Sequence, residues 1–239
     1  MSEEWKPFIE CKNTRALLQG IAKNIDRRMA REGVVIGPDV SSIFSIFSVT
    51  RPTDIKVVIL VEKNQRIYNT NMRAYTNAGI VYSTVKTALK SPMIAHLHEH
   101  VRRSYENAVI PPHGELTDFC SHGIFMMPIY WTMQKTVDAS SESQVYEPHV
   151  FWRMFSIAVL EYIYMVNKDK DPVIVLAGKG SKDLWQQGEM KRCNYRMVFT
   201  SSMTDSAFIE STMVQDINRH MKAAGHQLLD WNNIFNSTK

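Results

Sequence analysis

"DIKVVILVEKNQRIYNTN", residues 54–71, joins an uninterrupted apolar run to a cluster of polar and charged side chains. The run from Ile55 to Leu60 has the length and the β-branched content of a strand that is buried on both faces of a sheet. In open α/β sheets, ligands bind at the edge where the parallel strands end. The polar residues from Glu62 to Arg66 are therefore predicted to lie at a functional edge.

The rest of the chain alternates between similar strands and amphipathic helices. Three more apolar runs predict buried strands at 123–129, 173–178 and 196–201. Apolar residues that recur every three or four positions predict helices at 14–31, 93–106, 151–166 and 211–225. Strands that alternate with helices indicate an α/β fold, which we expect to be a three-layer α/β/α sandwich with a central four-stranded parallel sheet. The loops at 61–78, 128–148, 179–190 and 201–211 should then converge at one edge.

Length and composition limit the class of protein. The chain has 239 residues, of which 44% are hydrophobic, and we expect a single domain over residues 1–239. Its most apolar segment, residues 151–166, contains Arg153 and Glu161 and is shorter than the ~20 residues that a membrane span needs. The N-terminus lacks the pattern of a secretory signal, so we expect a protein of the reducing cytoplasm, in a host cell if its source is viral. Its three cysteines are predicted to be buried and unpaired.

Short motifs in the same order along nearly the whole chain resemble the uracil-DNA glycosylase family. "DIKVVIL" is similar to the strand that leads into the family's water-activating motif, and "PPHGELTDFCSHGIFMMP" resembles its Pro-x-His-Gly-Asp-Leu-Ser-x-Trp run and the strand that follows. "GIVYS" (79–83), "VIVLAG" (173–178) and "LLDWNNIF" (228–235) resemble three further family segments. The resemblance implies the family's fold, and it suggests a viral or phage member.

The positions that carry the family's chemistry hold other residues. Lys63 stands where the family has the Asp that positions water, Pro128 where it has an Asn that reads uracil, and Ser202 where it has a His that supports the departing base. Tyr82 takes the place of an aromatic Phe, and Glu62 lies one position before the missing acid. Exchanging an anion for a cation about 4 Å from a positive transition state costs roughly 8 kcal/mol at an effective dielectric constant near 20, a rate loss on the order of 10⁵. This reasoning predicts that the chain is not an enzyme and needs no cofactor.

The resulting hypothesis is a non-catalytic nucleic-acid-binding protein that favours RNA or single-stranded nucleic acid over duplex DNA. A protein-interaction subunit of a viral replication assembly is the alternative, and a residual DNA glycosylase is the third. The residues predicted to bind nucleic acid are Lys63, Arg66, Arg73, Tyr82, Lys179, Lys182, Lys191, Arg192 and Arg196.

Two other motifs invite a different chemistry. His96, His98 and His100 suggest a metal site, but only His96 and His100 share a helix face, so an exposed polar face is favoured and no metal is predicted. "AGKGSKD" (177–183) follows a predicted strand but lacks the spacing of a nucleotide-binding P-loop. Its backbone amides and lysines remain candidates for phosphate contacts.

Overall fold

The computed structural model describes residues 1–30, 34–38, 42–63, 68–69, 74–75, 80–84, 86, 90–136, 145–186 and 193–236. The α-helices are α1 (Lys6–Ile9), α2 (Lys12–Met29), α3 (Ile46–Val49), α4 (Pro92–Ser104), α5 (Thr117–Ser121), α6 (Arg153–Asn167), α7 (Lys179–Gln186) and α8 (Met213–Ala223). The strands are β1 (Val34–Gly37), β2 (Val57–Lys63), β3 (Tyr68–Asn69), β4 (Ala74–Tyr75), β5 (Ile124–Tyr130), β6 (Met133–Thr136), β7 (Val145–Pro148), β8 (Val173–Ala177) and β9 (Arg196–Thr200).

A four-stranded parallel sheet forms the centre of the molecule, with the strand order β5-β2-β8-β9. These are the four strands expected from the apolar runs, so the prediction of an α/β fold with this sheet is confirmed. From Val57 to Leu60, β2 is fully buried, because it lies between two neighbouring strands and is covered on both faces. A continuous apolar run without alternation is the pattern that such a strand requires.

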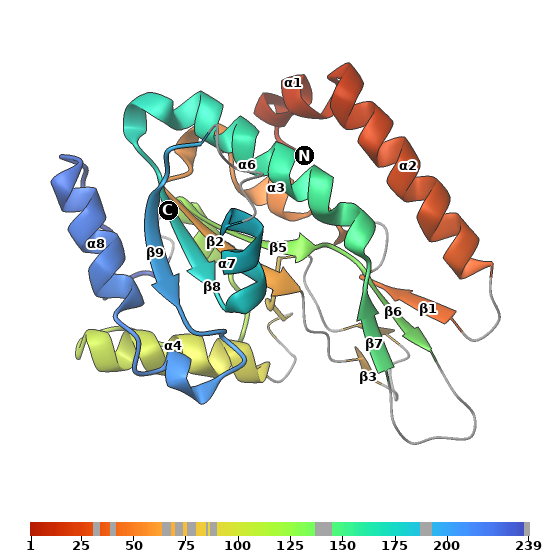
Figure 1. Ribbon diagram of the computed structural model, residues 1–239. Helices are drawn as coiled ribbons and strands as arrows, with labels where there is room; N and C mark the ends of the chain where they lie inside the picture. The colour runs from red at the N-terminus through yellow and green to blue at the C-terminus, as the bar shows by residue number, and fades with distance from the viewer. Residues whose placement is uncertain are drawn as a thin grey trace.

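Helices cover the sheet on both sides, as the three-layer prediction requires. Figure 1 shows α2 and α6 on one side of the sheet, and α4 and α8 on the other. The helix α6 packs against β5, and α8 packs against β8 and β9. The four helices predicted from the sequence correspond to α2, α4, α6 and α8, with shifts of only a few residues at their ends.

Local signals explain where the helices begin and end. The Ser91 side chain caps α4 by accepting a hydrogen bond from the Ile94 amide, and Pro92 occupies the first turn. Gly225, at a φ of +73°, ends α8 in the left-handed conformation that glycine adopts at low cost. Aromatic rings fill the core near the N-terminus, where Trp5 lies against Phe47 with ring centroids 4.6 Å apart.

Several elements were not predicted from the sequence, among them a second sheet and the helix α7. A second sheet, in the order β1-β6-β7, is antiparallel and uses residues of the expected loop at 128–148. The helix α7 lies in the expected loop at 179–190. In the described part of the chain, no helix is long and apolar enough to cross a membrane.

The cysteines follow the prediction in two of three cases. Cys120 and Cys193 are buried, and burial raises the pKa of each thiol to about 12. The prediction is wrong for Cys11, which is exposed and caps α2 by accepting a hydrogen bond from the Thr14 amide. All three thiols are free.

Candidate functional site at the carboxyl edge of the sheet

The four parallel strands reach the same edge of the sheet in register. Val61 of β2 is paired with Pro128 of β5 on one side and with Ala177 of β8 on the other. Ala177 is in turn paired with Thr200 of β9. The residues that follow this row therefore meet at one edge, which we call the carboxyl edge.

Glu62 supplies a carboxylate at this edge. It follows the buried Val61, and because side chains alternate along a strand, Glu62 and Lys63 point to opposite faces of the sheet. The Glu62 carboxylate lies against the first turn of α7, where a Cβ built on Gly180 would come within 2.5 Å of Glu62 Oε2. The absence of a side chain at Gly180 therefore makes room for the acid. The partial positive charge of a helix N-terminus favours an anion at this place.

Tyr82 lies close to Glu62. Its ring is buried, and burial raises the pKa of its hydroxyl above the usual range, with a further contribution from the negative charge of Glu62. Tyr82 adopts a φ of +64°, which is rare for a residue with a side chain and marks a strained position. The Ser91 hydroxyl donates a hydrogen bond of 3.3 Å to the Tyr82 carbonyl and thereby supports this backbone.

The segment that resembles the family's Pro-x-His-Gly run holds the Tyr82 region in place. The Leu116 amide donates to Ser83 Oγ at 3.0 Å, and the Thr84 amide donates to the Gly114 carbonyl at 3.0 Å. A Cβ on Gly114 would lie 2.6 Å from Thr84 Oγ1, so this close approach requires glycine. The two motifs recognised in the sequence thus form one supporting unit beside Glu62.

The histidines of α4 organise the loop after β9. His96 donates from Nδ1 to the Met203 carbonyl at 2.9 Å, and His100 donates from Nδ1 to the Ile209 carbonyl at 3.2 Å. These two residues share a face, as the sequence predicted, and that face contacts the loop rather than solvent. No group of three or more His, Cys, Asp or Glu side chains within the described ranges could hold a metal.

His98 lies apart from the other two histidines. Its Nδ1 accepts a hydrogen bond of 3.2 Å from Lys90, whose ammonium group also donates to the Pro111 carbonyl at 2.7 Å. Burial lowers the pKa of His98 to about 3, and the positive charge of Lys90 adds to this effect. Neutral His98 therefore helps to anchor the segment that begins at Pro111.

Pro128 borders an apolar void at the same edge. Val81, Pro128 and Trp131 are among the residues that line it, and its volume is about 10 Å³. A void of this size holds about one water molecule at most. A larger ligand at the carboxyl edge would therefore have to lie on the side of Glu62 and Tyr82.

The structure brings only part of the predicted binding set together. Lys63 ends β2, and Lys179 and Lys182 belong to the first turn of α7, next to Glu62 and Gly180. Arg196 lies at the other end of the sheet, because it is the first residue of β9, and it forms an ion pair with Asp171 at 2.5 Å. Arg66, Arg73, Lys191 and Arg192 lie outside the described residues.

Sequence reasoning gave too little weight to Glu62. It assigned the position of the acid to Lys63 and discounted Glu62, because an acid one residue earlier would need a shifted backbone to point into the site. The signal that could have identified Glu62 is its combination with Gly180: an acidic residue ends one strand, and a glycine begins the helix after the neighbouring strand. Ser202, at the family's His position, bonds to Thr204 Oγ1 at 2.8 Å within its own turn.

Comparison with known proteins finds sequence relatives that share one name, uracil-DNA glycosylase. No family model matches the sequence. A uracil-DNA glycosylase of Pseudoalteromonas translucida is 26% identical over 161 residues, which are 67% of this chain and 67% of that protein. The uracil-DNA glycosylase of human herpesvirus 7 is 22% identical over 235 residues, 96% of this chain and 85% of the relative.

The fold agrees with these relatives. The crystal structure of mimivirus uracil-DNA glycosylase superposes with a TM-score of 0.72 at 18% identity, covering 97% of this chain and 87% of that one. The enzyme of Nitratifractor salsuginis superposes with a TM-score of 0.58 at 13% identity, covering 94% of this chain and 91% of that one. The expected glycosylase-like fold is therefore confirmed.

These comparisons overturn two expectations. Two predictions are wrong: that the protein is non-catalytic and favours RNA or single strands, and that it is not an enzyme. The relatives that match most of this chain are named uracil-DNA glycosylase, which is an enzyme that acts on DNA. The physical reason for the error is the assumption that Lys63 leaves this edge without an acid. Glu62 places a carboxylate there, against Gly180 and close to Tyr82. These names agree with the third reading, a DNA glycosylase, and they do not test the alternative of a protein-interaction subunit.

Proposed function

Because the chain belongs to the uracil-DNA glycosylase family, we propose that it is a DNA glycosylase that removes uracil from DNA, with residues 1–239 acting as one catalytic domain. The observation that carries the proposal is the Glu62 carboxylate at the carboxyl edge, with Gly180 on one side and Tyr82 nearby. Catalytic groups of open α/β sheets gather at this edge. The three features come from β2, from the first turn of α7 and from the segment before α4.

Glu62 has the chemistry that glycosidic cleavage requires. As the C1′–N1 bond breaks, its electron pair leaves with uracil, and positive charge develops on the sugar. An anion about 4 Å from that charge stabilises it by roughly 4 kcal/mol at an effective dielectric constant near 20. Water then adds to C1′ and gives its proton to the Glu62 carboxylate, which passes it on to the uracil anion. The products are free uracil and an abasic site in DNA.

Tyr82 and the lysines complete the proposed site. The Tyr82 ring is buried, so a base can stack on it only after the groups that cover the ring move aside. Lys179 and Lys182 provide positive charge beside Glu62, where the phosphates of the DNA that flank the reacting nucleotide would lie. Lys63 adds positive charge at the end of β2, on the opposite face of the sheet. The two charges have different partners, since the lysines attract the backbone and Glu62 faces the sugar.

A uracil-release assay tests the proposal. The purified chain is incubated in excess over three oligonucleotides of the same sequence, which carry a single deoxyuridine in DNA, thymidine at that position, or uridine in RNA. We expect free uracil from the first alone, in an amount equal to the deoxyuridine present. Uracil release from none of the three, with protein in excess and the fold verified by circular dichroism, would refute the proposed function.

A further inference from the structure

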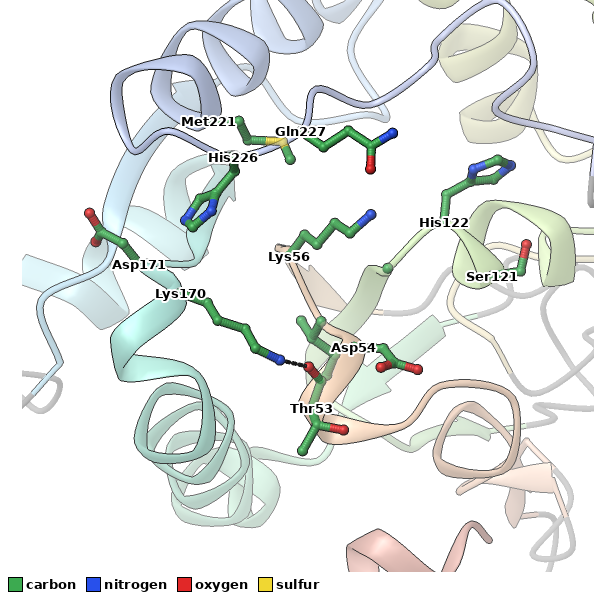
Figure 2. Close-up of a pocket in the computed structure, with 12 residues that line it drawn as sticks. Thr53, Asp54, Lys56, Ser121, His122, Lys170, Asp171, Met221, His226 and Gln227 are labelled. Atoms are coloured by element: carbon green, nitrogen blue, oxygen red, sulfur yellow. Dashed lines mark hydrogen bonds between the residues drawn. The ribbon is translucent and has the colours of Figure 1, made fainter.

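A cavity of about 410 Å³ lies at the opposite edge of the same sheet. Its walls come from the residues just before the parallel strands, among them Lys56 before β2, Gly123 before β5 and Asp171 before β8. His226 and Gln227, which follow α8, close it from another direction (Figure 2). Its volume is within the range of small-molecule sites, and it shares no lining residue with the carboxyl edge.

The cavity carries positive charge that its own acids do not neutralise. Asp54 is engaged by Arg51, with Arg51 Nε and Asp54 Oδ2 2.6 Å apart, and Asp171 is engaged by Arg196 at 2.5 Å. Neither carboxylate forms an ion pair with Lys56 or Lys170 among the described residues. The two ammonium groups are therefore available to an anion from outside.

The donors approach the cavity from several sides. Lys170 donates one hydrogen bond to the Thr53 carbonyl and keeps its other two N–H groups. Figure 2 shows the Lys56 side chain extending across the middle of the view, with His226 and Gln227 above it. Gly123 lets this lysine pass close to the backbone, because a Cβ there would lie 3.2 Å from Lys56 Cγ.

His226 contributes to the wall of the cavity. His226 Nε2 is shielded from solvent and has no hydrogen-bond partner within the described residues. Its backbone is fixed, since the His226 amide donates to the Met221 carbonyl at 2.9 Å after the glycine that ends α8. Because Nε2 is shielded in this conformation, the imidazole would have to turn before it could donate to an acceptor in the cavity.

We propose that this cavity binds a phosphate group of a nucleotide-sized molecule. A phosphate offers oxygen acceptors in a tetrahedral arrangement, which suits donors that arrive from different directions, as Lys56 and Lys170 do here. A planar carboxylate is better matched by the paired N–H groups of an arginine, and both nearby arginines are already engaged by aspartates. The volume beyond the lysines leaves space for a sugar or a base. This site is separate from the proposed excision chemistry.

Thermal unfolding and calorimetric titration test the site with three probes: inorganic phosphate, thymidine 5′-monophosphate and oligothymidylate. Phosphate salts stabilise many proteins without binding to them, so the readout is the difference between variants at equal salt. We expect the wild-type chain to bind the monophosphate, with a Tm rise of about 4 °C at a concentration ten times Kd. Lys56→Gln with Lys170→Gln should weaken binding at least tenfold.

Two control variants show whether the loss of binding is specific to the cavity. Lys12→Gln with Lys23→Gln removes the same charge from the exposed face of α2, and it should bind the monophosphate as the wild type does. Glu62→Gln should also bind it normally, which separates this site from the proposed function. Binding of oligothymidylate alone would overturn the proposal, because the lysines at the carboxyl edge account for DNA binding. Equal binding by the pocket variant and the α2 variant, or no binding of any probe, would overturn the proposal.

Discussion

The two edges of the central sheet differ in the charged group that β2 places at each of them. At the carboxyl edge, β2 presents Glu62 to the first turn of α7 and the neighbourhood of Tyr82. At the other edge, Lys56 enters the same strand and shares a cavity with Lys170. A strand of this length separates the two groups by roughly 20 Å, and exposed charges so far apart are largely screened at physiological salt. Glu62 at one edge suits a developing cation, and Lys56 with Lys170 at the other suits an anion. A variant at one edge should therefore leave binding or catalysis at the other edge unchanged.

The largest expected effect comes from neutralising Glu62. Glu62→Gln keeps the size of the side chain but removes the charge, and we expect kcat for uracil release to fall about 10³-fold, equivalent to about 4 kcal/mol. Steady-state assays on deoxyuridine-containing duplex DNA provide the measurement. Glu106→Gln, an exposed change of the same charge, is the control and should keep the wild-type kcat. Equal rates for the Glu62 and Glu106 variants would remove Glu62 from the mechanism.

The next effect sharpens the role of the first turn of α7. In Gly180→Ala, the new Cβ would lie 2.5 Å from Glu62 Oε2 and force the carboxylate to move. A displacement of about 1 Å at a catalytic group can lower the rate about 10²-fold, and we expect a fall of that order in kcat. Gly20→Ala, in the middle of α2, has no atom within 4 Å of its Cβ and serves as the control. The control should retain full activity and unfold at a slightly higher temperature.

The lysines beside Glu62 should affect binding of DNA more than chemistry. Lys179→Gln with Lys182→Gln is expected to raise KM about tenfold at moderate salt and to leave kcat within twofold of the wild type. The dependence of the logarithm of affinity on the logarithm of salt concentration should become shallower by about 2, one for each lost phosphate contact. Fluorescence anisotropy on labelled DNA measures this slope. An unchanged slope would place these lysines away from the DNA.

The smallest effect concerns stability and the buried histidines. Because the pKa of His98 is about 3 in the folded chain, His98 stays neutral while the unfolded chain takes up a proton below pH ~6.5. Protonation therefore favours the unfolded state, and the Tm should fall by several degrees as the pH drops from about 6.5 towards 3. Burial lowers the pKa of His100 as well, which acts in the same direction. His98→Asn should unfold at a lower temperature at pH 7 and show a flatter pH dependence in calorimetry. A pH dependence as steep as that of the wild type would show that His98 does not titrate in this way.

The sequence predicted the sheet and the main helices because their signals are local. An apolar run such as Val57–Val61 reports burial on both faces wherever it occurs, and the helix ends at Ser91 and Gly225 carry their own capping residues. The β1-β6-β7 sheet was not predicted, because β6 and β7 are short and partly polar and therefore lack the apolar run that marks the central strands.

The candidate site was predicted only in part, for a geometric reason. The sequence placed polar residues at the carboxyl edge, but it assigned the position of the acid to Lys63 and discounted Glu62, which the structure places against Gly180. Arg196 was assigned to the binding set although it opens β9, and a parallel strand that begins at Arg196 places it at the amino edge with Asp171. The cavity around Lys56 had no sequence signal, because its walls come from segments before three different strands.

The most direct test is a structure of the Glu62→Gln variant bound to duplex DNA that contains one deoxyuridine, where the intact substrate is held by a slowed enzyme. The quantity to measure is the distance from the substituted side-chain carboxamide of this variant to C1′ of the deoxyuridine. The account predicts a separation of about 4 Å, with the base beside Tyr82. A deoxyuridine sugar that lies against another carboxylate, or at the Lys56 edge, would contradict it.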